Sequence, residues 1–155
     1  MAPIKFEIKK ELDGQLGRAG VITTPHGVIE TPAFVSVGTK ASVKALTPEQ
    51  IKETGAQVVL ANTYHLYLEP GDERVRKFGG LQKFMNWFGP TMTDSGGFQV
   101  FSLLENNTIT DDGVEFRSHL DGTKHFFTPE KAIEIQENLG ADIIMAFDEC
   151  APAGV

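Results

Sequence analysis

The amino-acid sequence predicts an α/β fold in which helices alternate with the strands of a parallel sheet. Two units carry this prediction, because each has a helix followed directly by an apolar strand. The first unit has a helix beginning at residues 47–49 (TPE) and a strand at 57–61; the second has a helix beginning at 128–130 (TPE) and a strand at 142–147. Both strands end in polar residues, and polar groups at the carboxyl ends of parallel strands are typical of active sites.

The two helices have clear beginnings and ends. A threonine hydroxyl can cap the first turn, the proline suits the first helical position, and an acidic residue follows it. Gly55 ends the first helix and Gly140 ends the second. The second helix is expected to bury an apolar stripe, with the following residues on or near it: Ala132, Ile133, Ile135, Gln136 and Leu139.

The N-terminal region predicts short strands at 4–12 and within 19–37, separated by glycines and the turn at 24–27 (TPHG). Counting strands of the parallel type gives about four. They are 33–37, 57–61, 91–93 and 142–147.

Two further segments have recognisable patterns. Residues 72–88 read as helical pieces, whose large apolar side chains are expected in the core: Phe78, Leu81, Phe84, Trp87 and Phe88. Residues 114–127 predict a hairpin that turns at Asp121-Gly122. His119 and His125 flank that turn, and we do not expect them to bind a metal, because no third ligand is spaced to join them.

Composition excludes several classes of protein. With 155 residues, 41% of them hydrophobic and 23% charged, the chain can form one ordinary domain. It has no apolar run as long as a membrane span and no secretory signal at its N-terminus. Its one cysteine, Cys150, excludes an internal disulfide, so we expect a cytoplasmic protein. A net charge of −7 argues against binding nucleic acid by bulk electrostatics.

The stretch that follows the strand at 91–93 is the strongest candidate for a site. Asp94 stands where that strand ends, and Gly96 and Gly97 allow a flat ligand to approach the backbone closely. Ser95 and Gln99 add a hydroxyl and an amide, and Phe98 adds a stacking face. The alternative is an ordinary turn in which Asp94 bonds its own backbone. We expect a further strand at 100–103.

Three motifs, in order and at matching spacing, resemble the bacterial tRNA-guanine transglycosylases, also called queuine tRNA-ribosyltransferases. They are residues 94–103 (DSGGFQVFSL), 62–66 (NTYHL) and 147–150 (FDEC), and the resemblance covers essentially the whole chain. It implies an eight-stranded TIM-type (β/α)8 barrel with a zinc-binding subdomain inserted late in the chain. Because closing such a barrel takes about 250 residues, we expect residues 1–155 to form its N-terminal half, with an N-terminal antiparallel β extension and an inserted β-hairpin.

The resemblance also implies an activity. Members of the family are pentosyltransferases that exchange guanine at the wobble position of tRNAs with a GUN anticodon for the 7-deazaguanine preQ1, in queuosine biosynthesis. The exchange passes through a glycosyl-enzyme intermediate, and the enzymes are expected to be cytoplasmic homodimers. The family's nucleophilic aspartate and its structural zinc ligands, three cysteines and a histidine, lie downstream and are absent here. We therefore expect no metal in this chain and no activity from it alone.

Roles carry over to this sequence residue by residue. Asp94 corresponds to the general acid–base, which handles the proton of the purine, and Asp148 to the carboxylate that reads the guanine edge. The remaining correspondences are Phe98 for stacking, Ser95, Gly96 and Gly97 for the floor, Cys150 beside the pocket, and Asn62 and Gln99 near the ribose and Asp94.

These roles agree with elementary chemistry. A guanine edge presents two adjacent donors that one carboxylate can accept as a bidentate pair. Asp94 can hold a proton only where its environment raises its pKa, as a shielded second carboxylate would. The alternatives for single residues are a helix N-cap for Asp148 and a buried apolar side chain for Cys150. The alternatives for the protein are a barrel hydrolase that uses Asp94 and Asp148 as a carboxylate pair, and a non-catalytic subunit of a transglycosylase.

Overall fold

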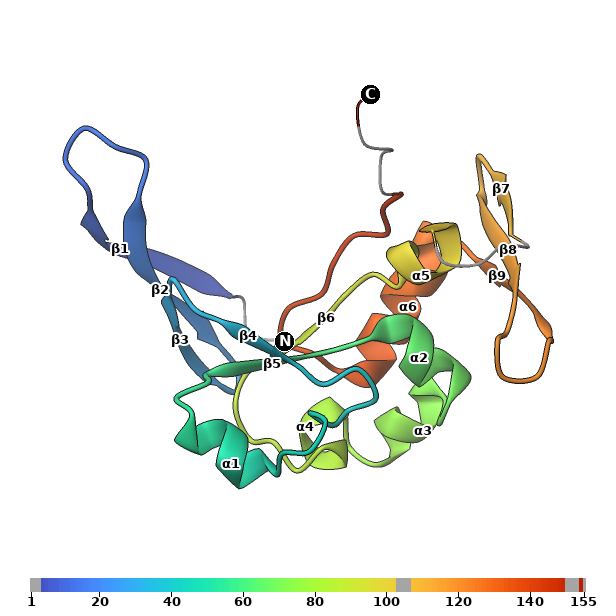
Figure 1. Ribbon diagram of the computed structural model, residues 1–155, viewed down its shortest axis with the longest axis horizontal. Helices are drawn as coiled ribbons and strands as arrows, with labels where there is room; N and C mark the ends of the chain where they lie inside the picture. The colour runs from blue at the N-terminus through green and yellow to red at the C-terminus, as the bar shows by residue number, and fades with distance from the viewer. Residues whose placement is uncertain (1–3, 103–106, 150–153, 155) are drawn as a thin grey trace.

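The computed structural model describes residues 4–102, 107–149 and 154, and shows three small sheets with short helices packed beside them (Figure 1). The strands are β1 (Lys5–Glu11), β2 (Arg18–Thr24), β3 (Gly27–Thr31), β4 (Val35–Val37), β5 (Val58–Ala61), β6 (Thr91–Thr93), β7 (Thr108–Thr110), β8 (Gly113–Arg117) and β9 (Lys124–Phe127). The helices are α1 (Pro48–Glu53), α2 (Thr63–Leu68), α3 (Asp72–Lys77), α4 (Leu81–Phe84), α5 (Gly97–Ser102) and α6 (Pro129–Leu139).

The predicted N-terminal extension is confirmed as an antiparallel sheet of order β1-β2-β3. It projects to one side of the other elements (Figure 1). A polar network centred on the buried Asp142 joins its β2–β3 turn to the rest of the chain. His26 Nδ1 lies 2.7 Å from Oδ1 of Asp142, whose side chain is 1% exposed. Asp142 Oδ2 accepts hydrogen bonds from the Thr91 backbone N–H at 2.9 Å and from Gln82 Nε2 at 3.2 Å.

The second sheet is parallel, with the order β4-β5-β6. β5 lies in its centre, where Val58, Val59 and Ala61 are buried. The two predicted helix–strand units are present in part: α1 precedes β5, and α6 precedes the segment 142–147. Thr47 and Thr128 cap these helices as predicted, and Gly140 ends α6 at φ +73°.

The prediction of a fourth strand at 142–147 is wrong. Only one bridge forms there, between Met92 and Ile143. The physical reason lies at Met145, whose N–H and C=O both bond to the Gln136 side chain instead of to a neighbouring strand. The parallel sheet therefore has three strands and a single bridge to the next segment, and the described residues do not close a barrel.

The prediction of a strand at 100–103 is also wrong, because α5 covers residues 97–102. Leu103 lies outside the described residues. Gly96, three residues after β6 ends, turns the chain at φ +76°, and the Val100 N–H then bonds back to the Gly96 carbonyl oxygen. Val100 is buried while Phe98 is 49% exposed. Such one-sided burial is that of a helix. A run of four residues is too short to separate this periodicity from that of a strand.

Two of the five aromatic and aliphatic side chains expected in the core are exposed. Leu81 and Trp87 are buried, but Phe78 is 64% and Phe88 75% exposed. Trp87 fills the interior and donates its indole N–H to the Pro90 carbonyl oxygen. Phe78 packs edge-on against Phe84 at the surface, with ring centroids 5.8 Å apart.

The third sheet confirms the predicted hairpin. β8 and β9 pair in antiparallel fashion, and the turn between them includes Gly122 at φ +74°. β7 adds a strand that the sequence did not predict. Phe116 and Phe127, from β8 and β9, are completely buried in the main core with α2 and α6 residues such as Leu66 and Ile135.

Candidate functional site

The predicted site residues gather at the carboxyl ends of β5 and β6 and beside the segment that follows α6. Asn62 follows β5, Asp94 follows β6, and Asp148 lies in the segment beyond Ile143. A hollow of about 500 Å³ opens there, lined by Asp94, Ser95, Gly96, Phe98, Gln99, Met145, Ala146 and Asp148. Asn62 and Gly97 contact residues of this lining, and Cys150 lies outside the described residues. The described site residues therefore lie in or beside one hollow.

Three donors orient the carboxylate of Asp94. Asn62 Nδ2 donates to Oδ2 at 2.6 Å, and the backbone N–H groups of Thr63 and Gly96 donate to Oδ1 at 2.9 and 3.2 Å. Thr63 also donates its hydroxyl to the Asp94 carbonyl oxygen at 2.5 Å. The strand end and the start of α2 are therefore joined at both the side chain and the backbone of Asp94.

The local sequence explains the orientation of Asn62. It is the N-cap of α2, and its side-chain oxygen accepts the backbone N–H of His65 at 2.9 Å. An asparagine at this position satisfies an otherwise unpaired N–H at the helix start. With the oxygen committed to the cap, the amide nitrogen is left to face Asp94.

The pKa of Asp94 is raised above its ordinary value, and burial of the carboxyl group is the main cause. The hydrogen bonds from Thr63, Asn62 and Gly96 oppose this shift, because they favour the ionised form. The nearby charge of Asp148 raises the pKa further, but it is the smallest of the contributions. An upward shift of the Asp94 pKa is the one that proton transfer requires. Its main cause is burial, and not the second carboxylate.

Gly97, the first residue of α5, lets the backbone of Asp148 approach closely. A Cβ at Gly97 would collide with the Asp148 carbonyl oxygen, so only glycine admits that segment. Ser95 Oγ donates to Asp148 Oδ1 at 2.9 Å and accepts the Gly97 N–H at 3.1 Å. Ser95 thereby links the two carboxylate-bearing segments through its side chain.

Two residues of the site were missed at the level of sequence. Thr63 is completely buried and makes two hydrogen bonds to Asp94, and Gln136, on α6, bonds to residues next to the site. The helix that begins at Thr63 could have been found, because an asparagine before a helical segment is a common N-cap. One feature of the sequence indicated a hydrogen-bonding role for Gln136, namely that it is a polar residue within an apolar stripe.

The histidines of the hairpin bond to tyrosines of α2. His119 Nδ1 lies 2.7 Å from the Tyr64 hydroxyl, and His125 Nδ1 lies 2.9 Å from the Tyr67 hydroxyl. Across residues 4–102 and 107–149, no three histidine, cysteine, aspartate or glutamate side chains gather to hold a metal ion. The described part of the chain therefore does not provide the ligand set for the zinc that the resemblance implies.

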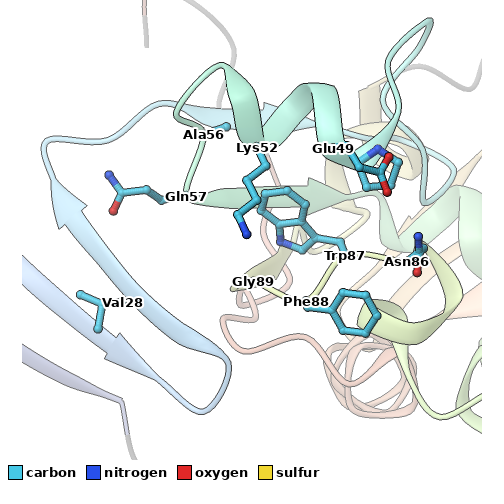
Figure 2. Close-up of a pocket in the computed structure, with 10 residues that line it drawn as sticks. Val28, Glu49, Lys52, Ala56, Gln57, Asn86, Trp87, Phe88 and Gly89 are labelled. Carbon is cyan, nitrogen blue, oxygen red and sulfur yellow. The ribbon is translucent and has the colours of Figure 1, made fainter.

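A second hollow, of about 400 Å³, lies at the opposite end of the parallel sheet (Figure 2). Gln57 and Gly89 line it just before β5 and β6 begin, and Figure 2 shows the Trp87 ring at its centre beside Lys52. Its charged residues, Glu49 and Lys52, come from one side of α1. Asp94, Asp148 and the donors to Asp94 lie at the first hollow, beside the carboxyl ends of β5 and β6. The first hollow is therefore the candidate site.

An α/β chain with a partly buried, hydrogen-bonded aspartate at a strand end, and a second carboxylate beside it, has the features of an enzyme active site. A sequence model described as queuine tRNA-ribosyltransferase matches residues 13–155, and the chain belongs to that family.

Curated relatives called queuine tRNA-ribosyltransferase agree. The protein of Desulforamulus reducens is 64% identical over 97% of this chain, and that of Caldanaerobacter subterraneus subsp. tengcongensis is 63% identical over 98%. That of Thermoanaerobacter pseudethanolicus is 61% identical over 98%. In each case the chain spans about 40% of the length of the relative. Within the part that the structure describes, no helix has the length and apolar character needed to cross a membrane.

Proposed function

We propose that residues 1–155 form the N-terminal part of a tRNA-guanine transglycosylase, whose barrel they begin and whose acid–base group and guanine-reading carboxylate they supply. The observation that carries this proposal is the placement of Asp94, with its raised pKa, in one hollow with Phe98 and Asp148. The term full-length enzyme denotes a family member that carries these residues together with the remaining length of its relatives.

The base is held by two side chains. The carboxylate of Asp148 accepts the N1–H and the exocyclic amino group of guanine, while Ser95 holds Oδ1 from the protein side. Each carboxylate oxygen has two acceptor positions, so Oδ1 can accept from Ser95 and from the base together. Phe98, about half exposed on the same hollow, stacks on the base. Stacking of this kind contributes about 1–3 kcal/mol.

Asp94 exchanges a proton with the purine. When the bond between the ribose and the base breaks, its electron pair stays on the purine, and the protonated Asp94 neutralises the developing charge. The incoming 7-deazaguanine returns a proton to Asp94 as the new bond forms. The ribose is held meanwhile as a glycosyl-enzyme intermediate on a nucleophile supplied by the remaining length of the full-length enzyme.

Other parts of the proposal rest on family membership alone. They are the tRNA with its GUN anticodon, preQ1 as the incoming base, a homodimer, and a structural zinc. Because the described residues do not gather a ligand set for zinc, we assign the zinc to the remaining length of the enzyme.

Exchange of radiolabelled guanine into tRNA by the full-length enzyme tests the acid–base assignment. Asp94→Asn should abolish exchange while the affinity for tRNA stays within about three-fold, because phosphate contacts supply most of the binding free energy. Asp13→Asn, at an exposed aspartate away from the site, is the matched control. Near-normal turnover of Asp94→Asn would refute the role, and a wild type without exchange would favour the non-catalytic subunit.

Competition kinetics test the choice of base. We expect a higher kcat/KM for preQ1 than for the bulkier queuine, with Asp148 reading the edge that the two bases share. Asp148→Ala should weaken both, since two buried donors of the base would lose their acceptor at about 1–3 kcal/mol each. Equal kcat/KM values for queuine and preQ1 would show that the assignment to preQ1 is wrong.

A further inference from the structure

Gln136 has the most fully bonded side chain near the site. It lies on α6 and is completely buried. Its Oε1 accepts the Thr93 hydroxyl and the Met145 backbone N–H, each at 2.9 Å. Its Nε2 donates to the carbonyl oxygens of Met145 at 2.8 Å and Ala132 at 3.2 Å. An amide offers two hydrogens and two acceptor positions, so every one is used.

The partners of Gln136 place it between the two carboxylates. Thr93 directly precedes Asp94, and Met145 lies three residues before Asp148. The backbone ladder between these segments consists of the Met92–Ile143 bridge, and the backbone bonds around it involve Thr91, Thr93, Asp142 and Ile143. Beyond that bridge, the Gln136 amide takes the position of a neighbouring strand, because it bonds both the N–H and the C=O of Met145.

We propose that Gln136 is a positioning residue, which sets the separation and orientation of Asp94 and Asp148 through Thr93 and the backbone of Met145. This inference rests on the proposed function. Gln136 need not contact the base. It acts because bidentate recognition and proton transfer tolerate displacements of only about 0.5 Å. A misplacement of about 1 Å can cost about a hundred-fold in rate.

Three variants of the full-length enzyme separate positioning from general support of the fold. Gln136→Met keeps the length of the side chain and removes all four hydrogen bonds. Gln136→Glu keeps the acceptors for Met145 and Thr93 and loses the donor when it is ionised. Gln82→Met is the matched control, because Gln82 is a buried amide that joins the same two segments at Thr91 and Asp142, at their far end.

Both methionine variants should lower the melting temperature, but only Gln136→Met should lower kcat, by about a hundred-fold. Gln82→Met should keep kcat within about three-fold. For Gln136→Glu, the ratio of its kcat to that of the wild type should rise as the pH falls, because a protonated carboxyl group can again donate to Met145. This variant also serves if Gln136→Met does not fold.

Equal loss of stability with unchanged kcat in both methionine variants would overturn the proposal. So would a Gln136→Glu ratio that does not depend on pH. If the wild type itself exchanges no guanine, the proposed function fails, and hydrogen exchange at the Met145 amide then decides the inference. Selective loss of protection there in Gln136→Met, with protection kept in Gln82→Met, would support the link, and unchanged protection would overturn it.

Discussion

The side-chain amide of Asn62 makes two hydrogen bonds. Its oxygen accepts the His65 N–H at the start of α2, and its nitrogen donates to Asp94 Oδ2 at 2.6 Å. The helix cap thus determines that Asn62 presents its nitrogen, and not its oxygen, to Asp94. Because the nitrogen of Asn62 can only donate, the atom opposite it must be an acceptor, which here is Asp94 Oδ2. The cap and the acid–base group are therefore one hydrogen-bonded unit.

The first prediction exchanges the two side chains. In the 155-residue chain, Asp94→Asn places an amide nitrogen opposite that of Asn62. Asn62→Asp places a second carboxylate opposite that of Asp94. The double variant restores a complementary pair, since the aspartate can still cap α2. We expect a favourable coupling of about 0.5–3 kcal/mol in a double-mutant cycle measured by urea unfolding, with guanine exchange still absent in the full-length enzyme. Additive free energies would mean that this contact is not formed.

The second prediction concerns the titration of Asp94, followed by ¹³C NMR of its carboxyl group. The pKa should lie above the ordinary value of 3.8, mainly because the group is buried. Asp148→Asn should lower that pKa only slightly, since the Asp148 charge contributes least. Asn62→Ala should raise it further, since a donor to the charged form is lost. A large fall in Asp148→Asn would reverse the ranking of causes.

The same shift has a consequence for stability. Because the pKa of Asp94 is higher in the folded than in the unfolded state, its protonation stabilises the fold. This contribution is complete below the unfolded pKa and is lost as the pH rises through the folded pKa. The destabilisation caused by Asp94→Asn, relative to the wild type, should therefore shrink as the pH rises through that window.

The third prediction is that Gly97→Ala destabilises the 155-residue chain. Alanine is favoured over glycine within a helix by at most about 1 kcal/mol, whereas overpacking costs about 1–3 kcal/mol. The colliding atom is the backbone oxygen of Asp148, which cannot rotate away, so the cost should exceed the gain.

The control for this prediction is Gly17→Ala, where the new methyl group meets the flexible end of the Leu12 side chain. Its free energy of unfolding should change by only about 0.5 kcal/mol or less, as at an ordinary surface position. Equal effects of the two substitutions in urea unfolding would show that Asp148 is not held at Gly97.

The fourth prediction compares the two ends of the His26–Asp142 pair by urea unfolding. Asp142→Ala leaves the buried Thr91 N–H without its acceptor. An unsatisfied buried donor costs about 1–3 kcal/mol, and the hydrogen bond from Gln82 is lost as well. The His26 side chain is 43% exposed, so water can replace part of its contact. Asp142 also keeps its two other donors when His26 is removed. His26→Ala should therefore cost less, about 0.5–1.5 kcal/mol.

Lys9→Ala is the control for the fourth prediction, because it breaks a pair that is exposed at both ends. It should change the free energy of unfolding by about 0.5 kcal/mol or less. A larger loss of unfolding free energy in His26→Ala than in Asp142→Ala would contradict the burial argument.

Local signals in the sequence predicted those parts of the fold that local chemistry determines. The caps at Thr47 and Thr128 and the turn at Gly122 were read correctly, because the residue types at a helix start or a tight turn have few alternatives. The position of Asp94 after β6 followed from the same reasoning. The family motifs then indicated Asn62 and Asp148 as residues of the same site.

Tertiary competition explains what the sequence did not predict. The segment 142–147 is apolar enough for a strand, yet the side chain of Gln136, which no local pattern connects to it, takes its hydrogen bonds. The helix α5 depends on the turn at Gly96. Of the adjacent aromatic residues Trp87 and Phe88, the structure buries the first and exposes the second. Each outcome requires knowing which segments are neighbours in space.

The His26–Asp142 contact joins residues 116 positions apart. A ribosome that adds roughly 5–20 residues per second needs roughly 6–23 seconds between them. The antiparallel sheet can pair its own strands in that interval, since they are neighbours in the chain, but its anchoring carboxylate has not yet been made. A nascent chain arrested before Asp142 should therefore carry a formed N-terminal sheet that lacks this ion pair and is joined to the rest of the chain by contacts such as Glu30–Gln57 and His26–Gln82. Until translation resumes, a protease should cleave such a sheet more readily than in the finished chain.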